Sequence, residues 1–164
     1  MINIKHIRAQ AWGFDLMIAS ILFLGGIIVF YIYSLNYPEE GRETLERLSY
    51  DGWIIADNLL SEGFPINWNE TNVVRIGILT NERVNETKLE RLYNLANTDY
   101  QKTKALFNTK YHYYFTFSEQ IVLPTYGPIS GIGLIPTNPT NLIKITRLIV
   151  YQNKPVSLDI YVWE

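Results

Sequence analysis

The uncharged run at residues 16–35 constrains the fold of this chain more than any other feature. About twenty residues at the rise of an α-helix span the hydrocarbon thickness of a bilayer, about 30 Å. The apolar core of a secretory signal is usually shorter, about 7–15 residues, and no clear small-x-small cleavage motif ends this run. A buried core helix is the other alternative, but such helices usually carry a polar stripe. We therefore predict a single membrane-spanning helix.

The charges that flank the run predict its orientation. Lys5 and Arg8 precede it, with His6 between them, whereas residues 39–43 contain several glutamates against one arginine. Basic flanks stay on the cytoplasmic side of a membrane. We therefore expect a single-pass cell-membrane protein with its N-terminus in the cytoplasm and residues 38–164 outside.

The composition excludes several kinds of chemistry. The chain has no cysteine, which removes thiol catalysis, iron–sulfur ligation and cysteine-bound zinc. A net charge of −2 and the absence of a lysine and arginine cluster argue against nucleic-acid binding. Residues 40–164 are long enough to bury a core without disulfides.

Helical periodicity returns after residue 38. Apolar residues at three- and four-residue spacings predict a helix over 42–62, which Gly63 ends, and a second helix over 88–96. Thr98 and Gln101 have the spacing of a capping box, which predicts a short helix over 99–107.

The remaining sequence is typical of a sheet. The segment 124–141 is rich in proline and glycine and predicts a long loop. The strand-like runs are 73–79, 111–117 with an extension at 119–123, 144–151 and 156–163. Residues 152–155 predict a closing hairpin between the last two of these runs. The fold class that we predict is α+β: a long N-terminal hydrophobic helix, then a small extracytosolic domain of helices packed on an antiparallel sheet.

Few residues of this domain suggest catalysis. His112 is its one histidine and lies among aromatic residues in a predicted strand, so we interpret it as structural; no partner ligands at metal-site spacing accompany it. Gly131 and Gly133 lack the strand-to-helix context of a phosphate-binding loop. The sequence shows no set of a nucleophilic side chain, a general base and an acid that would orient the base. We expect no catalytic residue, metal or cofactor, and a protein that is not an enzyme.

Two Asn-x-Thr triplets are candidates for N-glycosylation. They are Asn69-Glu-Thr71 and Asn85-Glu-Thr87, and each lies beside a predicted turn, where an exported chain is open to modification. The alternative for Asn85 is that its side chain caps the helix that follows.

The residues before the apolar run resemble a known processing site. Arg8-Ala9, followed by Gln10 and an apolar helix, resembles the class III signal peptide of archaeal type IV pilin-like proteins, and segments within 51–115 loosely resemble their extracytosolic parts. The resemblance implies that a prepilin peptidase, a membrane aspartyl peptidase, cleaves between Ala9 and Gln10. It divides the chain into a leader (1–9), a transmembrane and assembly helix (10–37) and an extracytosolic domain (38–164).

The same resemblance implies partners and a role. The partners are the prepilin peptidase, other pilin-like subunits, a membrane assembly platform and the lipid bilayer. The role is that of a structural or accessory pilus subunit at the cell surface, in adhesion or surface assembly. The alternative is a single-span membrane-anchored binding module that does not assemble.

Asp15 is the candidate assembly residue. Well-known pilins carry a glutamate at the fifth mature position, whereas here Phe14 takes that position and the acid follows it. Asp15 either stabilises the positive end of its helix at the membrane interface or pairs with the new α-amine of a neighbouring subunit. Close helix approach is permitted by small residues, namely Ala19, Ser20, Gly25 and Gly26.

Overall fold

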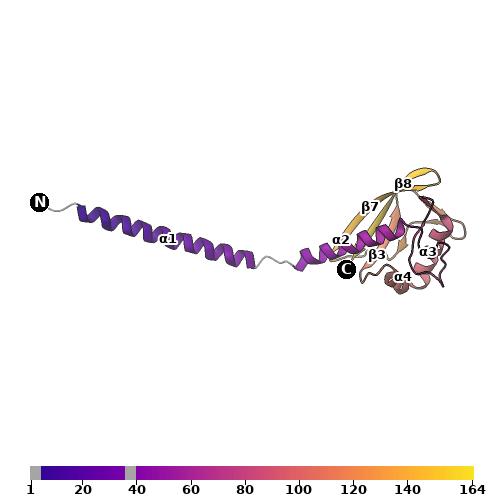
Figure 1. Cartoon of the computed structure of the whole chain (residues 1–164), viewed down its shortest axis with the longest axis horizontal. Coiled ribbons are helices and arrows are strands. Elements are labelled where there is room, and N and C mark those ends of the chain that lie inside the picture. The colour runs from indigo at the N-terminus through magenta and orange to yellow at the C-terminus, as the bar shows by residue number, and fades with distance from the viewer. Residues whose placement is uncertain (1–4, 36–39) are drawn as a thin grey trace. The chain divides into compact units, whose positions relative to one another are not determined.

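A computed structural model describes the backbone of residues 5–35 and 40–164 and the side chains of residues 12–35 and 41–164. The chain divides into two compact units, residues 1–39 and 40–164. The first unit contains the helix α1 (Lys5–Leu35), and the second contains three helices and the sheets (Figure 1). The predicted α+β fold is therefore confirmed.

The helices of the second unit are α2 (Glu40–Leu59), α3 (Glu86–Thr98) and α4 (Tyr100–Leu106). Asn85 caps α3 by accepting a hydrogen bond from the backbone N–H of Lys88 at 3.1 Å. The predicted capping box at Thr98 is wrong, because the Thr98 hydroxyl donates to the Asn94 carbonyl within α3. The chain leaves helical geometry one residue later, at Asp99, whose carboxylate caps α4.

The main sheet has the strand order β6-β3-β8-β7, and all its pairs are antiparallel. Its long hairpin closes at Gln152 and Asn153, with φ of 47° and 62°, as the two central residues of a type I′ turn require. This confirms the predicted hairpin. The strands are β3 (His112–Phe117), β6 (Ile132–Gly133), β7 (Leu142–Tyr151) and β8 (Lys154–Trp163).

The prediction of a strand over 73–79 is wrong. Only the end of that run belongs to a strand, β1 (Leu79–Thr80), which pairs with β2 (Arg83–Val84). The backbone before it bonds the segment 59–64 instead: Arg75 forms an isolated antiparallel bridge with Phe64, and the N–H of Ile78 donates to the Leu59 carbonyl at 3.0 Å. Much of the run is buried, but its hydrogen-bond partners lie at the end of α2 and in the loop that follows that helix.

The loop predicted over 124–141 contains short strands. Residues 119–123 do not extend β3; β4 (Ile121–Leu123) turns back and pairs with β5 (Gly127–Ile129). β6 then joins the main sheet, where Gly133 lies opposite Tyr114 of β3. A Cβ at Gly133 would lie 2.5 Å from the Tyr113 carbonyl oxygen, so only glycine permits this pairing.

The edge of β3 beyond β6 is closed by a side chain. β6 pairs with only Tyr114 and Phe115. Beside them, the hydroxyl of Tyr100 accepts a hydrogen bond from the N–H of Tyr113 at 2.9 Å and lies 3.3 Å from the Tyr113 carbonyl oxygen, to which it donates. Burial raises the pKa of this hydroxyl, so it keeps its proton.

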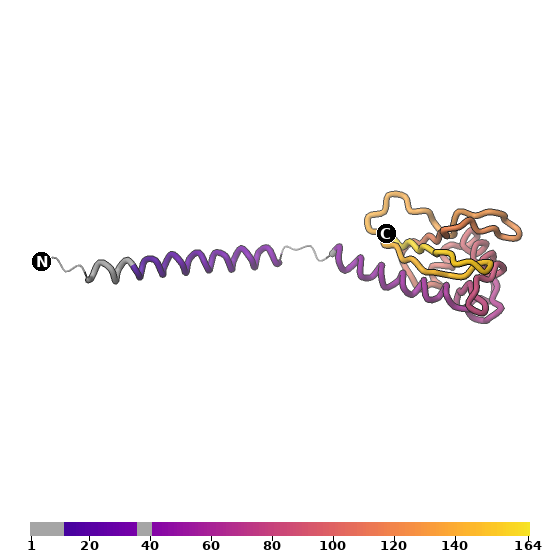
Figure 2. The backbone as a smooth tube through the Cα atoms, turned by 90° about the horizontal axis from the view of Figure 1, so that it is seen from above, coloured from indigo at the N-terminus to yellow at the C-terminus, as the bar shows by residue number. Residues whose placement is uncertain are grey.

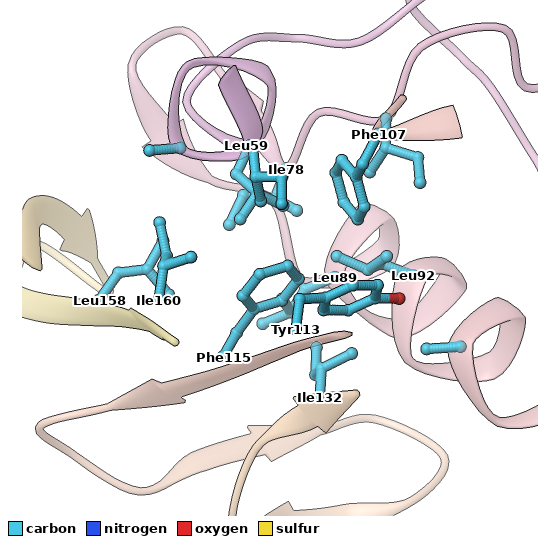
Figure 3. Packing of buried hydrophobic residues seen from close by; sticks show 14 of the residues in the cluster. Leu59, Ile78, Leu89, Leu92, Phe107, Tyr113, Phe115, Ile132, Leu158 and Ile160 are labelled. Carbon is cyan, nitrogen blue, oxygen red and sulfur yellow. The ribbon is translucent and has the colours of Figure 1, made fainter. Parts of the chain in front are cut away.

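Three helices and the segment 63–79 cover one face of the sheet. α2 lies beside β7 and β8 (Figure 2). It approaches closely at Gly52, where a Cβ would lie 2.8 Å from Cδ1 of Ile143 and of Ile145. Figure 3 shows the core that results, with Phe115 and Tyr113 from β3 facing Leu89 and Leu92 of α3.

Every residue of this hydrophobic core lies within residues 40–164. We therefore expect the fragment 41–164 to fold without α1 and to remain soluble. Its urea unfolding, followed by circular dichroism, should be one cooperative transition. A broad, non-cooperative transition or strong binding of a hydrophobic dye would contradict this expectation.

Candidate functional site

The apolar part of α1 is the first candidate site. Residues Trp12–Leu35, 24 in all, are long and apolar enough to cross a membrane, and none of their side chains is buried within the structure. At 1.5 Å per residue this segment is about 36 Å long. Since the helix does not contribute to the core, a buried core helix is excluded. Length and composition of this kind are shared by membrane anchors and signal sequences.

One face of this helix combines an acid with small residues. Asp15 is the charged residue within Trp12–Leu35. Ala19 and Gly26 follow it at spacings that return to the same face, at about 100° per residue. A Cβ at Gly25 or Gly26 would meet no atom within 4 Å, so the backbone is open there to a neighbouring helix. Ser20 is exposed, and its hydroxyl donates to the Leu16 carbonyl one turn earlier on the same helix, at 2.9 Å.

The residues of the predicted cleavage site lie within the backbone of α1, but their side chains lie outside the described residues. These residues are Arg8, Ala9 and Gln10. Cleavage between Ala9 and Gln10 therefore stays a prediction, as does the leader 1–9. The predicted ends of the helix and of the domain, at 37 and 38, also lie outside the described residues.

His112 packs between aromatic rings. Its ring centroid lies 6.1 Å from that of Tyr100 and 5.8 Å from that of Trp163. Desolvation and the nearby charge of Lys104 lower its pKa, which favours the neutral ring. Within the described part of the chain, no group of three or more histidine, aspartate or glutamate side chains is placed to hold a metal ion.

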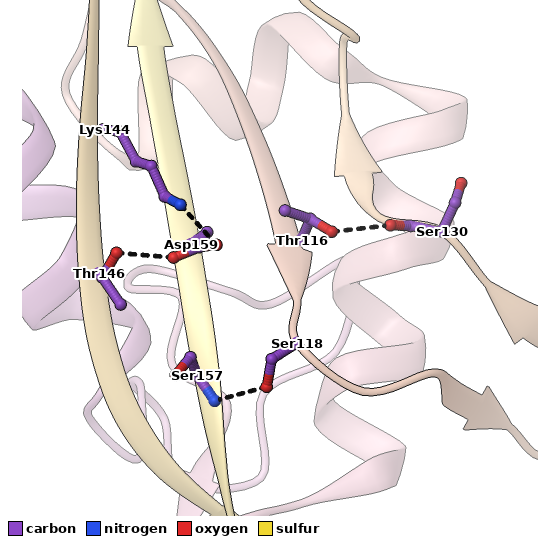
Figure 4. A network of polar contacts seen from close by, with 7 residues as sticks. All are labelled: Thr116, Ser118, Ser130, Lys144, Thr146, Ser157 and Asp159. Carbon is purple, nitrogen blue, oxygen red and sulfur yellow. Dashed lines mark hydrogen bonds and ion pairs between the residues drawn. The ribbon is translucent and has the colours of Figure 1, made fainter.

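The exposed face of the sheet carries a network of paired polar groups (Figure 4). Lys144 lies 2.9 Å from Asp159, and the Thr146 hydroxyl donates to the other carboxylate oxygen at 2.7 Å. Although burial alone would raise it, the pKa of Asp159 is held below its ordinary value by these hydrogen bonds and by the charge of Lys144. The charges of Lys144 and Asp159 are therefore paired with each other, as is usual where such residues stabilise the fold.

A cleft of about 890 Å³ lies between the first half of α2 and the connection from α4 to β3. Tyr50 is two-thirds exposed there, at 66%. Asp51 accepts a hydrogen bond from the Thr109 hydroxyl at 2.7 Å, and Arg47 pairs with Glu43 at 2.6 Å. Charged and hydroxyl side chains of both segments line this cleft, and the pairs just named hold several of them in place.

Both Asn-x-Thr triplets lie in the second unit, at different kinds of position. Asn69 lies in the turn between Trp68 and Val73, where it accepts hydrogen bonds from its own turn. Asn85 is the N-cap of α3, which confirms the alternative considered from the sequence.

Trp68 holds the segment 63–79 in place, a role that the sequence alone does not predict. Its side chain is completely buried, and its Nε1–H donates to the Gly77 carbonyl at 2.9 Å. Gly63 and Gly77 surround it: a Cβ at Gly63 would lie 2.7 Å from the indole ring. The sequence signal for this arrangement is one glycine on each side of the tryptophan, Gly63 before it and Gly77 after it.

No protein-family model, no curated protein and no solved structure matches this chain. The structure of this chain alone therefore gives its architecture, which is a long apolar helix followed by an α+β unit with an antiparallel four-stranded sheet.

Proposed function

We propose that this chain is a pilin-like structural or accessory subunit of an extracellular type IV-like filament, anchored through α1. The observation that carries the proposal is the contrast between the two units. Residues 40–164 bury their own core, whereas Trp12–Leu35 exposes every large apolar side chain. An apolar surface of this length must be covered by lipid or by other apolar helices.

The same helix provides for both kinds of cover. In a membrane, lipid surrounds it. In a filament, α1 helices of neighbouring copies replace the lipid, and the open backbone at Gly25 and Gly26 lets them approach closely. Asp15 then lies in an apolar environment and pairs with the α-amine that cleavage creates at Gln10 of a neighbour. The second units stay outside this helical core.

The cleft beside α2 favours the alternative function. A membrane-anchored binding module needs a recessed surface on its exported domain, and the cleft lined by Tyr50, Asp51 and Arg47 is one. This alternative requires a membrane anchor but no assembly.

Processing distinguishes these functions from each other and from a discarded signal. We expect the mature chain to begin at Gln10 and to occur in filaments sheared from cells, as measured by mass spectrometry of the N-terminal peptide. Arg8→Gln should block the cut, whereas Lys5→Gln, which changes a base outside the motif, should leave it intact.

Each other result has a definite meaning. A mature chain that still begins at Met1, or one cut beyond Leu35, contradicts the pilin-like function. A chain that is cut after Ala9 but stays in membranes and is absent from filaments favours the anchored binding module.

A further inference from the structure

We propose that Asn69 carries an N-linked glycan and that Asn85 does not. Both residues begin an Asn-x-Thr triplet, and both are half-buried, so neither sequence nor exposure distinguishes them. The hydrogen bonds of their side-chain amides do. The proposal rests on the extracytosolic placement of residues 38–164 in the proposed function.

Asn85 uses both ends of its amide within the fold. Its Oδ1 accepts from the backbone N–H of Lys88 at 3.1 Å, and its Nδ2 donates to the Thr80 hydroxyl at 3.2 Å. Its backbone N–H also donates to the Ile78 carbonyl, at 2.8 Å. The nitrogen that would accept a sugar therefore already donates to β1, and a glycan there must fit beside the contact that joins the start of α3 to that strand.

Asn69 uses only the oxygen of its amide. Oδ1 accepts from the backbone N–H of Thr71 at 2.9 Å, from the Thr71 hydroxyl at 2.7 Å and from the N–H of Asn72 at 3.1 Å. Its Nδ2 makes no hydrogen bond to any described residue. Three donors of the turn therefore hold the oxygen of this amide, and no described residue holds its nitrogen.

The surroundings of Asn69 leave room for a bulky group. Thr71 and Asn72 are exposed, and the turn stays closed without help from Nδ2, because the Asn69 N–H donates to Asn72 Oδ1 at 2.7 Å. Buried residues on both sides, Trp68 and Val73, anchor the turn in the core. A glycan at Asn69 can therefore extend into solvent without the loss of a contact that holds the fold.

The modification is a glycosyl transfer to this nitrogen. Nδ2 attacks the anomeric carbon of a lipid-linked glycosyl phosphate, and the bond from that carbon to the phosphate oxygen breaks. The lipid phosphate leaves, and Nδ2 loses one proton to a base of the transferase. The Thr71 hydroxyl, already bonded to the same amide, keeps the acceptor in its turn.

Glycopeptide mass spectrometry of the full chain, purified from its own host membranes, tests the proposal. We expect a glycan on the Asn69 peptide and an unmodified Asn85 peptide. Asn69→Gln should remove the whole glycan mass, and Asn85→Gln, although it removes the N-cap of α3, should leave that glycan mass unchanged. Thr71→Val should abolish the modification, and Thr71→Ser should retain it.

A third site provides the control for export. Asn138 and Thr140 are exposed, but Pro139 between them prevents their triplet from acting as an acceptor. Pro139→Ala removes that block. A glycan at Asn138 in this variant, with none at Asn69, overturns the proposal while export stands. Equal occupancy of Asn69 and Asn85 overturns the selection between them. No glycan at any of the three sites overturns the proposal and contradicts exposure of this domain to the transferase.

Discussion

Replacing Trp68 with alanine should lower the free energy of unfolding by about 3–5 kcal/mol. The indole is completely buried in the hydrophobic core, so its removal leaves a cavity there. The Gly77 carbonyl also loses the donor that lies 2.9 Å away. An unpaired buried carbonyl adds a desolvation cost of about 1–3 kcal/mol unless water reaches it.

Urea unfolding of the fragment 41–164, followed by circular dichroism, measures this loss. Trp53→Ala is the matched control, because it removes the same side chain from a half-exposed position on α2, where the guanidinium of Arg147 lies over the ring at 4.1 Å. That contact is worth about 0.5–1 kcal/mol. If the two variants lose the same stability, Trp68 does not anchor the segment.

Replacing Asp15 with asparagine should reduce incorporation into filaments about a hundredfold or more. In the proposed filament the substitution leaves the α-amine of Gln10 unpaired among apolar helices, and breaking a buried pair costs about 3–5 kcal/mol. Each 1.4 kcal/mol is a factor of about ten in an equilibrium constant. Membrane insertion and cleavage should stay near the parent level, since apolarity drives insertion and the cut lies upstream.

Two further variants show whether the charge is what matters. Asp15→Glu keeps a carboxylate and should restore most of the assembly, whereas Asp15→Ala should behave like the asparagine variant. Sheared filaments and membranes are assayed separately by quantitative mass spectrometry. If Asp15→Asn assembles like the parent, Asp15 is only an interfacial acid, and the anchored binding module becomes the better account.

The periodicity of apolar residues predicts those helices and strands whose hydrogen-bond partners are close in the sequence. The helix that contains Leu89 and Leu92 and the hairpin at Gln152 are of this kind. The run 73–79 has the β-branched residues of a strand, yet its hydrogen-bond partners come from the end of α2 and the loop after it. Local propensity contains no information about such distant partners.

The same reasoning explains what could be predicted of the candidate sites. The apolar length of α1 follows from composition alone, and so does the isolation of Asp15 within it. The difference between Asn69 and Asn85 depends on Thr80, which reaches Asn85 from β1. Lys88 is similar: a lysine in an amphipathic helix is expected in solvent, but this one is only 3% exposed, and its Nζ donates to the Glu62 and Leu79 carbonyls.

The two margins of the main sheet differ, and this difference limits how copies of the domain can associate. On one side the short β6 and the Tyr100 hydroxyl leave little backbone of β3 to pair. On the other, β7 is ten residues long and makes no backbone hydrogen bond beyond β8 among the described residues. Of these two margins, β7 is therefore the one with a long row of backbone groups left to pair with an added strand. When the β7 margins of two copies pair, each covers the other, so this edge supports a pair of copies and not a continuous sheet.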